Sequence, residues 1–245
     1  MEKKSLLAIF AHPDDETFRC GGTLALLAKC GVRVHILTFT RGQAGSRGQP
    51  PLCAPEELGA VRTNELRCSC QALGVEEPQV LDYADGSLTQ VRQEEGAARI
   101  TACIQSIRPQ VLLTWPPDGL SGHPDHQAVS RWTLEAFRQS VLAGVHEPGS
   151  LYCLAFPSSL AEKLGVAHLH AKPDSEITIA VNVESVWDKK MAAIHCHRTQ
   201  MGETPILTAS EENQRLFLGM EHFTKLACRN ERDFFFELLR PYAPV

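Results

Sequence analysis

Short apolar runs alternate with amphipathic segments along the first 140 residues or so of the chain. β-Branched and aliphatic runs favour strands, and longer segments with apolar positions three or four apart favour helices. Glycine follows two of the predicted helices, at Gly31 and Gly74, where a helix commonly ends. The pattern predicts strands at Ser5–Phe10, Val32–Phe39, Gln79–Leu81 and Val111–Thr114, and helices at Thr17–Lys29, Glu56–Leu73, Glu94–Ile107 and Asp125–Leu142.

This alternation indicates an α/β fold with a mostly parallel sheet and helices on both faces. After about residue 148 the pattern loosens. There we expect strands at Leu151–Phe156 and Ile177–Val181, a helix at Val186–His195, and a last strand or packed terminal segment at Phe234–Leu238. Because no repeat, low-complexity tract or linker interrupts the chain, we expect one domain over residues 1–245.

The segment Thr40–Pro55 differs from the rest because it is rich in glycine and proline and poor in apolar residues. It also carries Arg41 and Arg47 and leaves the end of the second predicted strand. A loop of this length in a compact domain is usually functional.

Two clusters of histidine and acidic residues follow predicted strands. The run Ala11-His12-Pro13-Asp14-Asp15-Glu16 comes directly after the first strand, and His123-Pro124-Asp125-His126 follows the strand Val111–Thr114. Burying an unpaired carboxylate is costly, and a divalent cation removes that cost by neutralising the acids. In open parallel sheets, ligands bind at the carboxyl ends of strands near the switch in strand order. We therefore expect the two clusters to meet in one metal site.

The spacing of the clusters favours a catalytic metal centre over a structural one. His12 and Asp15 can face one point from a tight turn, and His126 would complete a set of two imidazoles and one carboxylate. Three protein ligands leave coordination positions open for water and substrate. The first βα turn lacks both a G-x-G-x-x-G motif and a P-loop, so a dinucleotide site is not predicted.

The residues beside these ligands complete a hydrolytic site. Asp14 needs no metal contact and is our candidate general base for a water molecule. Asp125 would orient a neighbouring histidine, and a protonated His123 would stabilise a developing oxyanion. Together these parts describe amide hydrolysis through a tetrahedral intermediate. A plainer interpretation makes Asp14 or Asp15 a helix N-cap and Glu16 an acid favoured by the helix dipole.

The same set of ligands is compatible with two other classes of function. Two histidines and one carboxylate also form the facial triad of non-heme iron oxygenases, although those sites usually belong to β-barrels with a tighter ligand spacing. A module that binds metal and sugar without turnover is a third hypothesis.

The two clusters and several shorter motifs resemble the LmbE/PIG-L family of zinc-dependent N-acetylglucosamine deacetylases. The shorter motifs are Thr40-Arg41-Gly42, Gly45-Ser46-Arg47-Gly48, Arg62-Thr63-Asn64-Glu65, Leu73-Gly74, Asp85-Gly86, Lys190 and His195-Cys196-His197-Arg198-Thr199-Gln200. The resemblance covers about residues 5–202 and implies a Rossmann-like fold. It implies that His12, Asp15 and His126 bind Zn²⁺, for which another divalent ion such as Fe²⁺ is an alternative.

By the same resemblance, Asp14 is the base and His123 and Asp125 assist it. Arg62 and Asp85 would hold sugar hydroxyls, and Arg47 would suit a substrate carboxylate because an arginine fork binds carboxylates in bidentate fashion.

The segment Thr40–Pro55, called here the arginine–glycine loop, most resembles that of the members that deacetylate a GlcNAc-malate conjugate during bacillithiol biosynthesis. Two positions depart from that pattern: Gln43 stands where an acid is common, and Ser121 stands where an aromatic residue often helps the oxyanion.

Composition narrows the classes of partner. The net charge is −5 and no basic run occurs, so neither a nucleic acid nor a membrane surface is expected as a partner. No apolar stretch approaches the roughly 20 residues of a membrane span, and we expect a cytoplasmic protein. The partner is then a small amino-sugar substrate, with a homo-oligomer as an option. Nine cysteines, an odd and scattered set, are expected to be free thiols packed as small apolar side chains.

Overall fold

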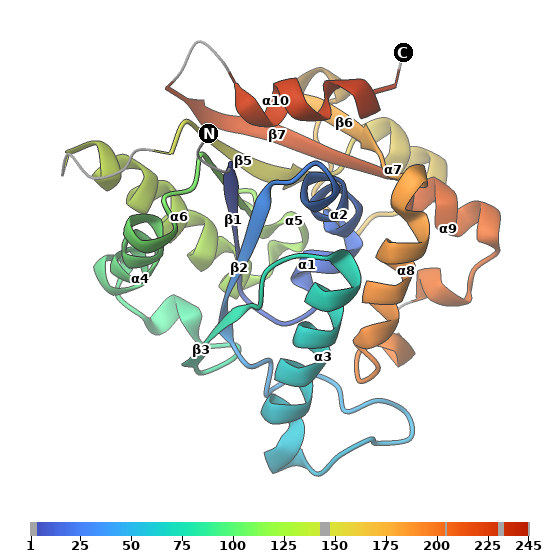
Figure 1. The fold of residues 1–245 in the computed structure, drawn as a ribbon. Coiled ribbons are helices and arrows are strands. Elements are labelled where there is room, and N and C mark those ends of the chain that lie inside the picture. Colours follow the sequence, from blue (N-terminus) through green and yellow to red (C-terminus); the bar gives the residue numbers. More distant parts are fainter. Residues whose placement is uncertain (1–3, 143–147, 204, 230–232, 245) are drawn as a thin grey trace.

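A seven-stranded sheet runs through the centre of the computed structural model, which describes residues 4–142, 148–203, 205–229 and 233–244 (Figure 1). The strands are β1 (Ser5–Phe10), β2 (Arg33–Thr40), β3 (Gln79–Tyr83), β4 (Val111–Thr114), β5 (Ser150–Ala155), β6 (Ile179–Asn182) and β7 (Met220–Cys228). Their order across the sheet is β3-β2-β1-β4-β5-β7-β6, and only β7 runs antiparallel to its neighbours. The predicted α/β, Rossmann-like class with a mostly parallel sheet is confirmed.

Helices cover both faces of this sheet. They are α1 (Asp15–Phe18), α2 (Gly21–Lys29), α3 (Leu58–Leu73), α4 (Gln93–Ile107), α5 (Gly119–Gly122), α6 (Pro124–Leu142), α7 (Ser158–Leu164), α8 (Trp187–Cys196), α9 (Glu211–Leu218) and α10 (Phe234–Leu239). Single 3₁₀ turns lie at η1 (Pro55–Glu57), η2 (Leu88–Gln90), η3 (Asp174–Glu176), η4 (Glu184–Val186), η5 (Met201–Glu203), η6 (Pro205–Thr208) and η7 (Arg240–Tyr242). Within the described ranges, no helix has the length and apolar character that a bilayer crossing needs.

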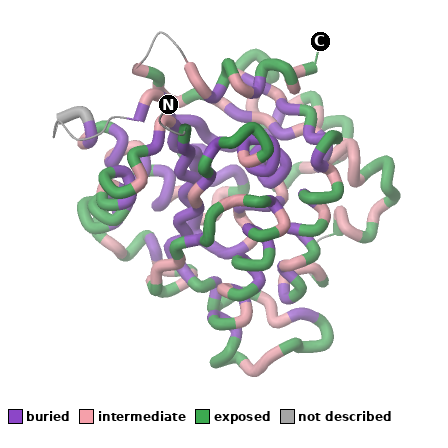
Figure 2. The backbone as a smooth tube through the Cα atoms, viewed as in Figure 1, coloured by how far each residue is buried: buried purple, intermediate pink, exposed green. Residues whose placement is uncertain are grey.

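The alternation of side chains along β1 divides the interior into two apolar cores. Leu6 and Phe10 belong to the core that includes residues of α2 and α3. Leu7 and Ile9 point the other way and pack with residues of α4 and α6. Burial therefore concentrates along the central strands, whereas the loop before α3 is mostly exposed or half-buried (Figure 2).

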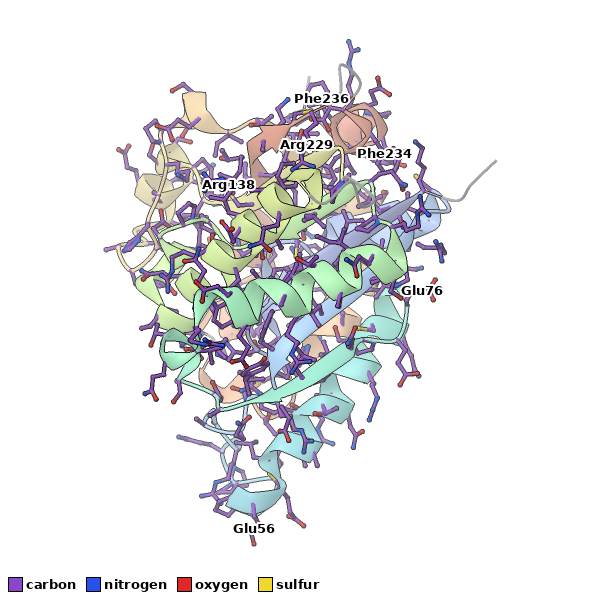
Figure 3. The ribbon with its side chains drawn as sticks, turned by 90° about the vertical axis from the view of Figure 1, so that its left-hand side faces the viewer. Glu56, Glu76, Arg138, Arg229, Phe234 and Phe236 are labelled. Carbon is purple, nitrogen blue, oxygen red and sulfur yellow. A yellow bond between two sulfur atoms is a disulfide. The ribbon has the colours of Figure 1, made fainter. Side chains whose placement is uncertain are left out.

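The loop between β2 and η1 lies at the carboxyl end of the parallel strands. Residues 41–54 contain no helix or strand, as the glycine-rich and proline-rich composition predicted. Figure 3 labels Glu56 just after this loop, at the end of the molecule opposite Phe234 and Phe236 on α10.

Two predicted elements differ in the structure, and the strand β7 was not predicted. The single helix predicted at Thr17–Lys29 is two helices, and α2 restarts at Gly21 because its first amides have a separate partner, described below. The alternation in β7 is too weak to have been recognised. Aromatic side chains favoured a strand at Phe234–Leu238, yet this segment is helical because the Asp233 carboxylate caps the amide of Phe236.

The prediction that all nine cysteines are free is wrong for two of them. Cys68 on α3 and Cys196 at the end of α8 form a disulfide, with their Cα atoms 5.7 Å apart. The two helices pack side by side, which brings together cysteines 128 positions apart in the chain. Local periodicity carries no information about such a pairing. Cys20, Cys70, Cys103 and Cys153 are buried, as expected, whereas Cys30 and Cys228 are exposed, which contradicts the expectation that every cysteine is packed in the interior.

A buried ion pair fastens α8, β7 and α2 to one another. Lys190 Nζ donates to Glu221 Oε1 at 2.7 Å and to the carbonyl of Leu218 at 2.6 Å, and both charged side chains are fully buried. The Glu221 carboxylate also accepts the amides of Gly22 and Thr23, at 2.9 and 2.7 Å. Glu221 is therefore the acceptor for the first free amides of α2.

We expect Lys190→Met to lower the free energy of unfolding by about 3–5 kcal/mol, because it leaves the Glu221 carboxylate buried without its cation. Urea denaturation followed by circular dichroism measures this change. The exposed neighbour provides a matched control, since Lys189→Met should change stability by no more than about 0.5 kcal/mol. Equal effects of the two substitutions would contradict a structural role for the pair.

Candidate metal centre

The two histidine and aspartate clusters meet where the strand order reverses, between β1 and β4. His12 and Asp15 lie in the turn that follows β1, and His126 lies in the first turn of α6. Their ligand atoms all lie within 4.8 Å of one another. His12, His123 and Asp125 form a second group within the same limit.

The turn after β1 fixes the carboxylate of Asp15. Its Oδ2 accepts the amides of Ala11 and His12, at 3.0 and 2.9 Å, and the indole N–H of Trp115 at 3.2 Å. The other oxygen, Oδ1, lies 3.5 Å from His126 Nε2. Burial alone would raise the pKa of Asp15, but His126 and His12 hold it well below its usual range. Asp15 is thus an ionised carboxylate with one oxygen turned towards the histidines.

Hydrogen bonds leave a lone pair on each histidine facing the other. The carbonyl of Gly119 lies 3.2 Å from His126 Nδ1 and can only accept, so the proton is on Nδ1 and Nε2 is bare. Asp125 lies 3.3 Å from His12 Nε2, which places the proton there and leaves Nδ1 bare. The two bare nitrogens are 3.3 Å apart. Facing lone pairs repel unless a proton or a metal ion lies between them, so these residues fit a divalent metal.

Two further carboxylates surround the outer nitrogen of His12. Asp85 Oδ1 is 3.1 Å and Asp125 Oδ2 is 3.3 Å from His12 Nε2. Although burial lowers the pKa of His12, its hydrogen bonds to the carboxylates of Asp125, Asp15 and Asp85 raise that pKa well above its usual value. The site therefore carries excess negative charge and attracts cations.

Asp125 is fully buried at the start of α6 and is held by the loop after β3. Its carboxylate accepts the amides of Gly86 and Leu88 at 2.8 and 3.0 Å, in addition to its contact with His12. A carboxylate here was predicted to orient a neighbouring histidine, and the histidine that Asp125 contacts is His12.

His123 lies beside the two facing histidines, and its ring stacks on that of His126 with centroids 4.5 Å apart. The amide of Asp125 donates to His123 Nδ1 at 3.2 Å, which places the proton of the neutral ring on Nε2. Burial and the neighbouring His126 lower the pKa of His123. The protonated form expected from the sequence is therefore disfavoured in this arrangement.

Asp14 stands next to the ligand set, and its backbone φ of 108° is in the left-handed region. Its carboxylate pairs with Arg62, with Oδ2 and Nη2 3.1 Å apart. Burial raises the pKa of Asp14 to about 6, and the Arg62 guanidinium opposes that rise.

Arg62 holds the turn and the arginine–glycine loop together. Its guanidinium donates to the carbonyls of Pro13 and Gly42, at 2.5 and 2.8 Å, and only 3% of the residue is exposed. Side chains at Gly42 or Gly45 would collide with this guanidinium, which explains glycine at both positions. The structure therefore brings Arg62 to Asp14 and leaves it little surface for a substrate.

The remaining predicted site residues, Asp85 and Arg47, lie on the same side of the metal centre as the arginine–glycine loop. Asp85 follows β3 and accepts the amide of Ala44 at 2.9 Å as well as contacting His12. Arg47 is half-buried in the loop and donates to the carbonyl of Cys53 at 3.4 Å. The structure thus brings Asp85 to the metal site and does not bring Arg47 to it.

Glu16 belongs to a buried network below the site. It accepts hydrogen bonds from Ser69 on α3 at 2.5 Å and from the amide of Asp14 at 3.0 Å. His197 Nε2 lies 2.6 Å from the same carboxylate, just beyond α8. Glu16 therefore ties the turn after β1 to α3 and to the segment just beyond α8.

Trp115 is a site residue that the sequence analysis missed. Its ring stacks on His126 at a centroid separation of 3.9 Å, and its indole N–H reaches Asp15, so one side chain contacts two of the three candidate ligands. The available signal was its position immediately after β4, one of the strands whose ends define the switch point.

Fold and site together define a Rossmann-like α/β protein with a candidate divalent-metal centre at its topological switch point. The chain belongs to the PIG-L family, described as GlcNAc-PI de-N-acetylase, whose pattern matches residues 7–137. It is 32% identical to a 1D-myo-inositol 2-acetamido-2-deoxy-alpha-D-glucopyranoside deacetylase from Acidothermus cellulolyticus, over 91% of this chain and 89% of that protein.

Solved structures share the fold. N,N'-diacetylchitobiose deacetylase from Pyrococcus horikoshii is 21% identical, with a TM-score of 0.68 over 92% of this chain and 84% of its own. GalB, a 4-carboxy-2-hydroxymuconate hydratase from Pseudomonas putida, is 19% identical, with a TM-score of 0.68 over 94% and 99%. A hydratase on this fold shows that the fold alone does not define the reaction.

One expectation about the type of relative is not supported. The loop suggested closeness to deacetylases of a GlcNAc-malate conjugate, whereas the relative from Acidothermus cellulolyticus is of the inositol type. The arginine–glycine loop is explained instead by its packing against Arg62, a structural demand that does not depend on the substrate.

We expect Trp115→Phe to weaken binding of Zn²⁺ roughly 10- to 100-fold, because it keeps an aromatic ring on His126 but removes the donor that orients Asp15. Competition titration against a chromogenic chelator measures this affinity. Trp187→Phe on α8 is the matched control and should leave the affinity unchanged. A wild-type affinity in Trp115→Phe would show that the indole N–H does not support the site.

Proposed function

We propose that this protein is a divalent-metal-dependent N-deacetylase that removes the acetyl group from an N-acetylglucosaminyl compound. The observation that carries the proposal is the pair of bare histidine nitrogens 3.3 Å apart, with an ionised Asp15 and a separate carboxylate, Asp14, beside them. Membership of the PIG-L family and the inositol-type deacetylase relative support the choice of reaction. The identity of the aglycone is left open by this proposal.

His12, Asp15 and His126 would hold the metal. Two imidazoles and one carboxylate suit Zn²⁺, and Fe²⁺ accepts the same ligands. When bound, such an ion supplies Lewis acidity, which polarises an amide carbonyl and lowers the pKa of water. Asp125 and Asp85 would keep the His12 ring in the orientation and tautomer that binding requires.

Asp14 is the proposed general base. Its carboxylate takes a proton from the attacking water while the water oxygen forms a bond to the acyl carbon. The carbon–nitrogen bond then breaks, and the nitrogen takes up a proton to leave as the free amine, with acetate as the other product. Burial raises the pKa of Asp14 to about 6, which suits a group that must both accept and return a proton near neutral pH. Arg62 is a positioning residue that holds this carboxylate.

His123 is the proposed donor to the carbonyl oxygen as negative charge develops there. Its proton lies on Nε2 because Nδ1 accepts the amide of Asp125, so the neutral ring can donate without being protonated further. This assignment supplies the donor that Ser121, standing where relatives often have an aromatic residue, does not. Asp85 and Arg47 are proposed for the sugar side, where hydroxyl or carboxylate groups would meet the loop before η1.

We expect Asp14→Asn to keep its bound metal but to lose activity roughly a hundred- to ten-thousand-fold, because the amide cannot accept the proton. Acetate release from a panel of N-acetylated amino sugars measures turnover, and elemental analysis measures the metal. Asp82→Asn is the matched control, since this exposed aspartate pairs only with Arg41 on the surface.

The outcomes separate the alternatives. Wild-type turnover by Asp14→Asn would remove Asp14 from its role, and loss of metal would show that it acts as a ligand. No acetate from any member of the panel would contradict the deacetylase. Oxygen consumption by the iron-loaded protein would favour an oxygenase.

A further inference from the structure

An apolar cavity of about 850 Å³ adjoins the metal centre on the side away from the arginine–glycine loop. Trp115 is the shared wall, because it lines the cavity while its ring stacks on His126. Phe18, at the end of the helix that carries Asp15, and Leu120, in α5, also line the cavity. The cavity is therefore continuous with the elements that build the site.

The far walls come from the opposite half of the sheet. Leu164 and Leu169 enter from α7 and the segment after it, and Leu216 and Phe217 enter from α9. Polar lining residues such as Lys163 and Glu212 are exposed and stand at the rim. The interior surface is thus formed by aliphatic and aromatic side chains.

The one buried charged residue in the lining does not provide an anion receptor. Arg19 donates to the carbonyl of Phe217 at 2.8 Å, and its guanidinium lies 4.8 and 5.1 Å from the ring centres of Phe156 and Phe217. Its Nε and Nη2 atoms make no hydrogen bond within the part of the chain that the structure describes, but both are buried and neither is exposed to the cavity. Arg19 therefore fixes the rings that form the wall, and the occupant of the cavity is apolar.

The positions of the polar and apolar surfaces assign the two ends of a substrate. The candidate sugar-binding residues follow β2 and β3, on one side of the metal centre, and the cavity lies towards β5, β7 and β6 on the other. Figure 1 shows the same separation, with β3 on one side of α1 and with α7 and α9 on the other. An amide positioned at the metal has its amine substituent on one side and its acyl group on the other.

We infer that the cavity is an acyl-chain pocket, so that the preferred substrates are N-acylglucosaminyl compounds with an acyl group longer than acetyl. This inference rests on the proposed amidase function and extends it to the substrate class. A methyl group is about the size of a water molecule, whose share of liquid volume is about 30 Å³, and would leave the cavity nearly empty. Cavities of roughly 300–1,000 Å³ hold much larger ligands.

The reaction is the same hydrolysis. The water oxygen bonds to the acyl carbon and the carbon–nitrogen bond breaks. The nitrogen takes up a proton, and the acyl group leaves as a medium-chain carboxylate.

A chain-length series tests the inference with the metal-loaded enzyme. N-Acetyl-, N-butyryl-, N-hexanoyl- and N-octanoylglucosamine are compared by release of free glucosamine. We expect kcat/KM to rise by up to about fourfold for each methylene that enters the cavity. Ala209→Trp, which places an indole at the cavity wall, should lower the octanoyl-to-acetyl ratio of kcat/KM at least tenfold. Ala98→Trp, on the exposed side of α4, should not change the ratio.

Two further measurements distinguish failure of the acyl-pocket inference from failure of the proposed function. The octyl glycoside of N-acetylglucosamine places the same chain on the aglycone, and preference for it over N-octanoylglucosamine would overturn the acyl assignment. Equal kcat/KM across the N-acyl series would overturn the inference while leaving the proposed deacetylase intact. If no member is hydrolysed, the proposed function fails, and calorimetry of octanoate binding then tests the cavity alone. Binding that Ala209→Trp abolishes would support an acyl pocket, and absence of binding to the wild type would contradict it.

Discussion

The concentration of carboxylates around two imidazoles at the β1–β4 switch point is the constraint on which the site depends. Asp15, Asp85 and Asp125 all contact His12, and two histidine nitrogens face each other with their lone pairs. Such an arrangement is unfavourable without positive charge, since like charges and facing lone pairs repel. A divalent cation would relieve this cost, which is why the cluster points to a metal.

The surrounding structure keeps these groups in place through buried polar contacts between helices. Glu16 links the turn after β1 to α3 and to His197, and Arg62 links the same turn to the loop before η1. Lys190 and Glu221 fasten α8 and β7 to α2. Each of these contacts satisfies a group whose burial would otherwise be costly. The carboxylates of the metal site, whose charges repel one another, are thereby held in place by surrounding side chains whose own charges are paired.

The two sides of the metal centre differ in character. The loops after β2 and β3 bring charged and polar groups, whereas α7, α9 and the end of α1 surround the centre's other side with apolar surface. A reaction that separates a polar amine from an acyl group matches this division. A hydratase shares this fold, so the fold alone does not define the reaction.

The sequence by itself determined most of the strands and helices of the first half and the meeting of the two clusters. These follow from local periodicity and from the rule that parallel strands end together. Only the tertiary structure decided that Arg62 faces Asp14, that Cys68 meets Cys196, that Trp115 contacts two ligands, and that an apolar cavity adjoins them. These relations join residues from distant segments. Their geometry depends on how helices pack against the sheet, which no local pattern specifies.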